Sequence, residues 1–339
     1  MERIKVTSAE VAARAGVSQS AVSRVFTPGA SASAKTVEKV KRAARELGYR
    51  PNVLARAMVS GRSRIIGLVV AYLDNQFYPI ALERFSNALQ AQGYHILIFT
   101  APNSTQGVDD VMQDLMDYQV DGIITASVSI SSDLADKANA AGIPVVLFNR
   151  GQDGSSFSSV TSANVAGGRK AAEFLLAGGH ERIAHIAGWQ GSSTGRDRRA
   201  GFLTALDAAG VAPWMVMDGM YQRDAAMECA RELLQGPKIP DAIFVGNDHM
   251  AFAVLDAVRM AGLVPGQDIS IVGYDDVPLA SWAAFDLTTI RQPVRRMVEA
   301  TVSTVLEHIE QPGTKPRQIE IEGDLILRGS ARIPKGWKK

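Results

Sequence analysis

A short stretch near the N-terminus, SQSAVSR at residues 18–24, carries side chains that can hydrogen-bond to DNA. Gln19, Ser20 and Arg24 offer amide, hydroxyl and guanidinium groups that match base edges or phosphates. Ser18 and Ser23 suit phosphate oxygens, which set register without reading sequence. The stretch therefore predicts non-covalent reading of duplex DNA, with a helical hairpin that merely has a polar face as the alternative.

Other polar and aromatic side chains follow apolar runs farther along the chain. They are Asn75, Phe77, Thr125, Ser127, Asn149, Asn247, Asp248 and Asp275, and the small Ala71 stands with them after the first run. In an open α/β sheet, ligands bind at the edge where the carboxyl ends of parallel strands meet. Any one Asn or Asp could instead cap a helix, and we expect Asp248 to do only that. Their number and common direction predict a binding cleft.

Arg198 and Tyr221 add a guanidinium fork and an aromatic ring to this candidate cleft. Arg198 stands at the head of the expected helix RAGFLTALDAAG, and its fork suits a carboxylate, a phosphate or paired hydroxyls. Ring faces bordered by Asn, Asp and Arg suit a sugar. We expect a sugar or sugar-derived acid as the ligand, with a purine or nucleoside second.

The elements that must position residues 18–24 are two short, closely packed helices. Thr7 and Glu10 have the capping-box spacing, so a helix is predicted from Ser8, and Gly16 ends it. Ser18 then caps a second helix through about Val25, and small alanines permit a close crossing. This is the pattern of a helix-turn-helix. A third helix is predicted from Ser33 to Gly48, with an apolar face and basic residues outside it.

From Ile65 onward, continuous apolar runs alternate with segments of helical length. The runs are IIGLVVAYL, YHILIFT, DGIITAS and IPVVLFN, and then RIAHIAG, DAIFVGN and ISIVGYD after about residue 162. Such an order predicts parallel, doubly wound sheets. Two similar α/β lobes with a cleft between them are expected.

Charge divides the chain in the same way. The first 62 residues hold 12 Lys and Arg against 4 Glu and no Asp, a net charge of +8, whereas the remainder holds 24 basic and 31 acidic residues, a net charge of −7. A basic head on an acidic body fits a polyanion-binding module joined to a regulatory domain. With 339 residues, one cysteine, no apolar leader and no run long enough to span a membrane, we expect two or three domains, no disulfide and a cytoplasmic location.

Sequence features of enzymes are missing. No GxxxxGK[ST] pattern occurs, Asp275 and Asp276 are adjacent rather than opposed, and no nucleophile accompanies them. The five histidines, His95, His180, His185, His249 and His308, are too scattered to suggest a metal site. We therefore expect no enzyme activity, no metal and no cofactor apart from the small-molecule effector.

At the level of whole motifs the chain resembles the lactose/galactose repressor (LacI/GalR) family of bacterial transcription regulators. The resemblance lies in VAARAGVSQSAVSRVF, SAKTVEKVKRAARELGYRPN, ARAMVSGRSRIIGLVV, GYDD and LTTIRQP, and it covers almost the whole chain. It implies a helix-turn-helix head, a periplasmic-binding-protein-like body, a double-stranded operator as partner and effector contacts from Asn149, Arg198, Tyr221, Asn247 and Asp275. The remaining alternative is a sugar-binding protein with no role on DNA.

The resemblance also implies a hinge that enters the minor groove. We expect Thr36, Tyr49 and Asn52 to join the DNA contacts, with Ala55 and Arg56 along the groove and Met58 as the apolar wedge where the family has leucine. Two further departures are Pro28-Gly29, near a position where family members often have asparagine, and Ala163, where many members have aspartate. No extra leucine-rich helix follows Arg328, which predicts a homodimer rather than a tetramer.

The expected organisation follows from these patterns. Residues 1–50 form the DNA-binding head, 51–63 the hinge helix and linker, and 64–339 the effector-binding and dimerisation domain. Within the latter we expect a first lobe at about 64–161 and 291–313 and a second lobe at about 162–290 and 314–330, with both strands of RQIEIEGDLIL finishing the second lobe.

Overall fold

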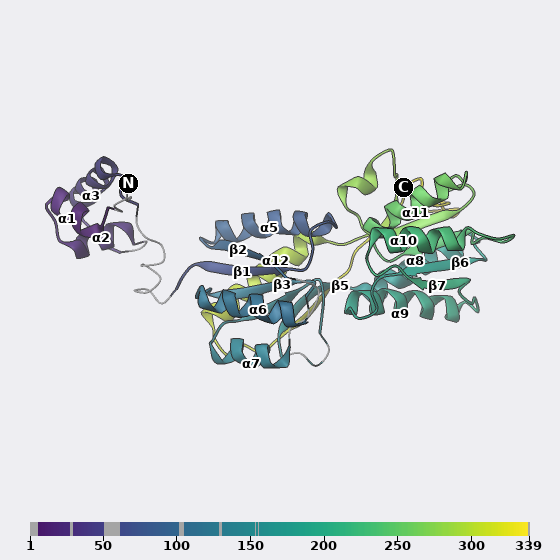
Figure 1. Cartoon of the computed structure of the whole chain (residues 1–339), viewed down its shortest axis with the longest axis horizontal. Helices are drawn as coiled ribbons and strands as arrows, with labels where there is room; N and C mark the ends of the chain where they lie inside the picture. The colour runs from purple at the N-terminus through teal and green to yellow at the C-terminus, as the bar shows by residue number, and fades with distance from the viewer. Residues whose placement is uncertain are drawn as a thin grey trace. The chain divides into compact units, whose positions relative to one another are not determined.

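The computed structural model describes residues 6–27, 30–50, 62–101, 105–128, 131–152, 154 and 156–337. The chain forms two compact units, Met1–Ser63 and Arg64–Lys339 (Figure 1). The expected hinge residues Asn52, Ala55, Arg56 and Met58 lie outside the described residues, as do Pro28 and Gly29.

The first unit contains three helices whose ends follow from local capping. They are α1 (Ser8–Ala15), α2 (Gln19–Phe26) and α3 (Ala34–Leu47). The Thr7–Glu10 capping box opens α1, and Gly16 closes it with a φ of 64° that favours glycine. Ser18 and Ser33 accept hydrogen bonds from the backbones of Ala21 and Thr36 and so cap α2 and α3. The predicted starts and stops are confirmed to within a residue.

Small side chains fill the core of this unit. Val11, Val22 and Val40 are at most 1% exposed, and three buried alanines complete the cluster. Because alanine and valine bring helix backbones close together, the three short helices form a stable unit although each alone is too short to persist in water. The polar side of α2 is thereby held outward.

The second unit contains two six-stranded sheets, one in each lobe (Figure 1). The first has the order β11-β5-β4-β3-β1-β2, with β1 Ile65–Val70, β2 His95–Thr100, β3 Gly122–Ala126, β4 Val145–Phe148, β5 Ser158–Ser162 and β11 Gln318–Ile321. The second has the order β12-β10-β9-β8-β6-β7, with β6 Ile183–Ala187, β7 Met215–Asp218, β8 Ala242–Val245, β9 Ser270–Asp275, β10 Thr288–Arg291 and β12 Leu325–Ile326. All pairings are parallel except that of β10 with the edge strand β12. The predicted fold class is confirmed.

Helices cover both faces of each sheet (Figure 1). In the first lobe they are α5 Phe77–Ala91, α6 Thr105–Asp117, α7 Ser132–Ala140 and α12 Val294–Glu310, and in the second lobe α8 Asn164–Ala177, α9 Ser193–Ala208, α10 Arg223–Leu233, α11 Asp248–Met260 and the short η1 Pro278–Ser281. Helices α5 and α12 share a core with one face of the first sheet, while α6 and α7 cover the other. This double cover explains why the strands read as continuous apolar runs.

Three connections cross between the lobes: from β5 to α8, from β10 to α12 and from β11 to β12. The last one corrects an expectation, because β11 does not finish the second lobe. It extends the first sheet in parallel with β5, and its Ile321 is buried in the core that α12 covers. The chain then crosses at Gly323, where a Cβ would lie 1.8 Å from the carbonyl oxygen of Arg291. The run RQIEIEGDLIL is thus divided between the lobes by a close backbone approach.

A second close approach positions the ligand-binding side of the second lobe. A Cβ on Gly168 of α8 would lie 2.1 Å from the Arg198 carbonyl oxygen, and one on Gly201 of α9 would lie 2.0 Å from that of Val165. Only glycine permits this contact, so the two helices bring Arg198 against the first turn of α8. No helix in the described part of the chain is long and apolar enough to cross a membrane.

Candidate functional site

The predicted reading residues lie together on the outer side of α2. Gln19, Ser20, Ser23 and Arg24 are all exposed, while Val22 between them is buried. The Gln19 Nε2 donates to Ser8 Oγ at 2.8 Å, which fixes the amide on the surface. No hydrogen bond or ion pair joins the Arg24 side chain to the described residues, so its guanidinium is available to a partner.

The neighbouring serines are partly committed to local structure. Ser18 Oγ accepts from the Ala21 amide at 3.2 Å and shares a 2.9 Å hydrogen bond with Ser20 Oγ. Thr36, at the start of α3, pairs with Ser33 at 2.8 Å, and the half-buried Tyr49 ring packs on Phe26 with 5.8 Å between centroids. These predicted DNA contacts therefore also stabilise the head. The arrangement can offer hydrogen bonds and positive charge to a duplex.

In the second lobe, Arg198 is the centre of a buried polar cluster. Its side chain is 3% exposed, its Nε donates to Asn164 Oδ1 at 2.9 Å and its Nη1 donates to the Gly246 carbonyl at 2.7 Å. The guanidinium lies over the Tyr274 ring at 3.6 Å and 3.6 Å from Asp275 Oδ1. Burial alone would lower the pKa of Arg198, but nearby phenols and Asp275 keep that pKa above its ordinary value. Arg198 lies in the second turn of α9 rather than at the helix head, because α9 begins five residues earlier.

Asp275 joins the two lobes. Its Oδ2 accepts from Asn75 Nδ2 of the first lobe at 3.2 Å, and its Oδ1 accepts from Gln292 Nε2 at 2.7 Å. Burial raises the pKa of Asp275, while Arg198 and the two amides oppose the rise by stabilising the carboxylate. Each carboxylate oxygen can accept a further hydrogen bond, so a ligand hydroxyl fits here.

The cap role expected of Asp248 is corrected, because Asn247 takes it. Asn247 is the helix cap, because its Oδ1 accepts from the Met250 amide at 2.9 Å. Asp248, which we expected to be only a cap, instead accepts from the Val277 amide at 3.0 Å and from Thr289 Oγ1 at 2.6 Å. Burial and then the charge of Asp275 raise the pKa of Asp248 well above its ordinary value. Asp248 thus holds the connections around β9 and β10 together, and only the Asn247 amide nitrogen remains for a ligand.

The first lobe supplies Asn149 and Thr125 from the ends of β4 and β3. Asn149 Nδ2 donates to Tyr78 Oη at 3.0 Å, but its buried Oδ1 has no partner among the described residues. Thr125 Oγ1 is likewise buried without a partner. Because buried polar groups are normally hydrogen-bonded, such atoms at strand ends indicate a ligand-binding surface.

The other residues predicted to bind the effector lie in the core, at the start of a helix or beside α9. Phe77 is 3% exposed and stacks on Phe148, yet it also lines the cavity described below. Asn75 Oδ1 accepts a hydrogen bond at 3.0 Å from the backbone amide of Phe77, the first residue of α5. The Tyr221 hydroxyl donates to Thr194 Oγ1 at 3.2 Å. Ala71 packs half-buried against the core on the α6 side and is not part of the cavity lining.

Five further polar or aromatic residues beside the predicted ones were not singled out in the sequence. They are Tyr72, Tyr78, Arg150, Trp189 and Gln292, all buried or half-buried near the predicted ones. Tyr72 directly follows Ala71, and Arg150 directly follows Asn149. The search for polar and aromatic residues after each apolar run would have found both if it had included one more residue. A structural signal also marks the region, since Ser127, Asn149, Tyr221 and Asp275 all have positive φ values. Such backbone strain clusters at binding sites.

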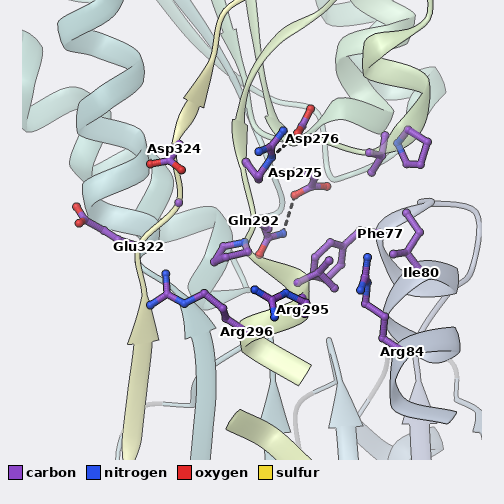
Figure 2. A pocket seen from close by; sticks show the side chains of 16 residues that line it. Phe77, Ile80, Arg84, Asp275, Asp276, Gln292, Arg295, Arg296, Glu322 and Asp324 are labelled. Carbon is purple, nitrogen blue, oxygen red and sulfur yellow. Dashed lines mark hydrogen bonds and ion pairs between the residues drawn. The ribbon is translucent and has the colours of Figure 1, made fainter. Parts of the chain in front are cut away.

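A cavity of about 530 Å³ opens between the lobes beside Asp275 (Figure 2). Phe77, Ile80 and Arg84 of α5 line one side of the cavity, and Asp275 and Asp276 line another (Figure 2). Arg295 and Arg296 of α12 also line it and are seen in the lower part of the picture (Figure 2). The size of the cavity suits a small metabolite. Within the part of the chain that the structure describes, no group of three or more His, Cys, Asp or Glu is placed to hold a metal ion.

Comparison with known proteins places both units in one class, a helix-turn-helix joined to a binding-protein-like body. The model for bacterial regulatory proteins of the lacI family matches residues 7–52, and that for a periplasmic binding protein-like domain matches residues 172–331. The ribose operon repressor of Escherichia coli (strain K12) is 30% identical over 330 residues, 96% of this chain and 99% of that protein.

Two solved structures extend the comparison. The Lac repressor dimer bound to operator and the anti-inducer ONPF is 28% identical, with a TM-score of 0.87 over 97% of this chain and 99% of that chain. The transcriptional regulator CelR in complex with cellobiose is 32% identical, with a TM-score of 0.72 over 96% of this chain and 100% of that chain.

The chain belongs to the lacI family of bacterial regulatory proteins. It is a DNA-binding transcriptional repressor with an effector-binding body, which confirms the resemblance inferred from the sequence. The alternative of a sugar-binding protein with no DNA role is not favoured, because the head itself matches the DNA-binding family.

Proposed function

We propose that this protein represses transcription as a cytoplasmic homodimer that binds a near-palindromic operator and releases it when a sugar or sugar acid enters the cleft. No other cofactor takes part. The dimeric Lac repressor on its operator supports the assembly, and the cellobiose complex of CelR supports a carbohydrate effector. The geometry of α2 and of the cleft supports the residue assignments there, while the assignment of Met58 rests on the family resemblance alone.

The DNA-binding half of the proposal rests on α2. Gln19 and Ser20 read bases in the major groove, Arg24 reads a base or holds a phosphate, and Ser18 and Ser23 bind phosphates. Two heads then contact half-sites about one helical turn apart, roughly 34–36 Å. Met58 of each hinge meets its counterpart at the centre of the operator and inserts as a wedge.

The single observation that carries the effector half is the set of buried, unpartnered polar atoms at the lobe edges. Thr125 Oγ1, Asn149 Oδ1 and Gln292 Oε1 have no hydrogen-bond partner among the described residues. The Gln292 amide nitrogen donates to Asp275, which faces Arg198. Hydroxyls spaced around a ring satisfy such atoms, and Tyr78 and Phe77 supply apolar faces. The lobes close on the ligand, and the closure changes the separation of the paired hinges.

The test combines binding and release. Fluorescence-labelled promoter fragments are titrated with the full-length protein at fixed salt, with bulk competitor DNA present, and each candidate effector is then added. Specific binding that falls on addition of a sugar or sugar acid supports the proposal. Release by a purine or nucleoside alone assigns the site to the second effector class, and equal affinity for all fragments contradicts the DNA-binding half.

A further inference from the structure

One buried cation in the effector cleft lacks a counter-charge among the residues that the structure describes. Arg150, directly after Asn149 at the end of β4, is 4% exposed, yet its Nε and Nη1 atoms are buried without a hydrogen-bond partner. No ion pair within the described residues involves its guanidinium. A buried charge of this kind is costly unless something compensates it.

The other buried charges of the cleft are compensated. Arg198 has Asp275 at 3.6 Å and two hydrogen-bond acceptors, and Asp275 has two amide donors. Asp248 accepts from Val277 and Thr289. Arg150 is therefore the exception, and the fork that suits an anion is Arg150 rather than the already occupied Arg198.

The surroundings of Arg150 lie in the cleft and favour an anion there. Its guanidinium is 5.5 Å from the Trp189 ring of the second lobe, and its charge is the largest effect that opposes the raised pKa of the Tyr78 phenol. The next amide, that of Gly151, donates to Ser193 Oγ at 3.0 Å, which ties this segment to the first turn of α9. The first amides of a helix have no intrahelical acceptor and attract negative charge.

The lining of the cavity beside Asp275 does not supply the same preference. Four arginines line it, Arg84, Arg291, Arg295 and Arg296, against four carboxylates, Asp275, Asp276, Glu322 and Asp324 (Figure 2). These charges balance. Selectivity for an anion must therefore come from inside the cleft.

We infer that the effector is a sugar derivative that carries a carboxylate or phosphate, and that this group binds the Arg150 guanidinium beside the N-terminus of α9. The inference rests on the proposed effector site and names its ligand class. The sugar ring then lies toward Asn149 and Asp275, whose polar atoms take its hydroxyls.

The experiment is calorimetric titration of the full-length protein with matched probes. D-Glucose is compared with D-gluconate and D-glucose 6-phosphate, and D-ribose with D-ribonate and D-ribose 5-phosphate, with inorganic phosphate and acetate as anion controls. We expect one acid or phosphate to bind about 10- to 100-fold more tightly than its neutral parent, the gain from a charge-assisted bond. The carboxylate and phosphate arms identify which anion the site takes.

Two variants assign that gain to one side chain. Arg150→Gln removes the charge and is expected to abolish the preference for the anionic probe, while Arg150→Lys retains part of it. Arg169→Gln, an exposed site on α8 outside the cavity lining, is the matched control and is expected to keep the preference. A neutral sugar that binds more tightly than its acid and phosphate overturns the inference and leaves a sugar effector intact, whereas binding of nucleosides alone overturns both.

A measurement without any ligand tests the same idea independently. If Arg150 is uncompensated, Arg150→Met should raise the melting temperature of the ligand-free protein by about 2 °C or more. A lower melting temperature in this variant means that the guanidinium has a stabilising partner in the protein, and it overturns the inference.

Discussion

The two functional surfaces of this repressor are built on opposite physical principles. The α2 surface is exposed, and its polar groups are either solvated or hydrogen-bonded within the small head, as Gln19 is to Ser8 of α1. The cleft places Arg198, Asp248 and Asp275 almost entirely out of solvent and satisfies them through partners distant in sequence. The polar groups of the head are therefore free to bind DNA. The buried charges of the cleft stabilise the fold only while each of them keeps its partners.

This difference leads to separate mutational signatures. Changes on α2 should alter DNA recognition and leave folding intact, because exposed polar side chains contribute little to stability. Changes in the cleft should affect stability and ligand binding together, because removing one member leaves another buried and unpaired. Four predictions test the comparison.

Arg198→Met should have the largest effect. It removes the positive charge that faces the Asp275 carboxylate and the donors to the Asn164 amide oxygen and the Gly246 carbonyl. The free energy of unfolding of the body should therefore fall by about 3–5 kcal/mol. Denaturation in urea measures the change, with the exposed Arg84→Met as control. A loss below about 1 kcal/mol would show that the cleft tolerates an incomplete charge set.

Acid should destabilise the second lobe through His185. This fully buried ring stacks on Phe244, and burial lowers its pKa to about 4 from an ordinary value near 6.5. The unfolded chain then binds a proton that the native state excludes, so stability falls as pH drops from about 6.5 to 4, by up to about 3 kcal/mol.

The matched variants are His185→Phe and His95→Phe. The first should flatten the dependence of unfolding free energy on pH within that window, while His95 is exposed and its replacement should leave the dependence unchanged. Parallel curves for wild type and His185→Phe would assign the acid sensitivity to another group.

On the head, Gln19→Ala and Ser20→Ala should change which bases are preferred, each lost contact costing about 1–3 kcal/mol in discrimination. Ser23→Ala, at an expected phosphate contact, should weaken all duplexes alike. Selection from random duplexes measures the preference, and the unfolding free energy of the three variants should stay within about 0.5 kcal/mol of wild type. The same consensus from all four proteins would remove Gln19 and Ser20 from the reading role.

The smallest effect is expected for Thr125→Val. The Thr125 hydroxyl is buried without a partner among the described residues, so replacing it with a methyl group of similar shape should stabilise the ligand-free protein by about 1 kcal/mol. The same change should weaken effector binding by a similar amount. Destabilisation would mean that the hydroxyl is satisfied without a ligand.

Local signals predicted much of the fold. The capping box at Thr7 and Glu10, the glycine stops at Gly16 and Gly48 and the serine caps each act within a few residues, and all are confirmed. The apolar runs likewise predicted parallel sheets. The run RQIEIEGDLIL was misassigned because the close contact at Gly323, which divides it between lobes, involves Arg291 and leaves no trace in the local pattern.

The candidate cleft was predicted less completely. The strand-end rule found Asn149, Thr125 and Asp275, but it stopped one residue short of Arg150. It also assigned the helix cap to Asp248 rather than to Asn247, since either side chain suits a helix start and only their partners distinguish them.

The sequence by itself determined the helix boundaries, the strand pattern, the basic head and the class of regulator, because these depend on neighbouring residues, composition and ordered motifs. Only the tertiary structure decided which buried arginine is compensated. Asn75 and Asp275 are 200 residues apart in the chain yet hydrogen-bonded. Glycines let α8 and α9 approach closely, so Arg198 donates to Asn164, and its guanidinium lies 3.6 Å from Asp275. The interaction between two charges depends on their distance in space. Arg150 and Arg198 therefore differ in electrostatic compensation once the chain is folded, although the sequence does not distinguish them.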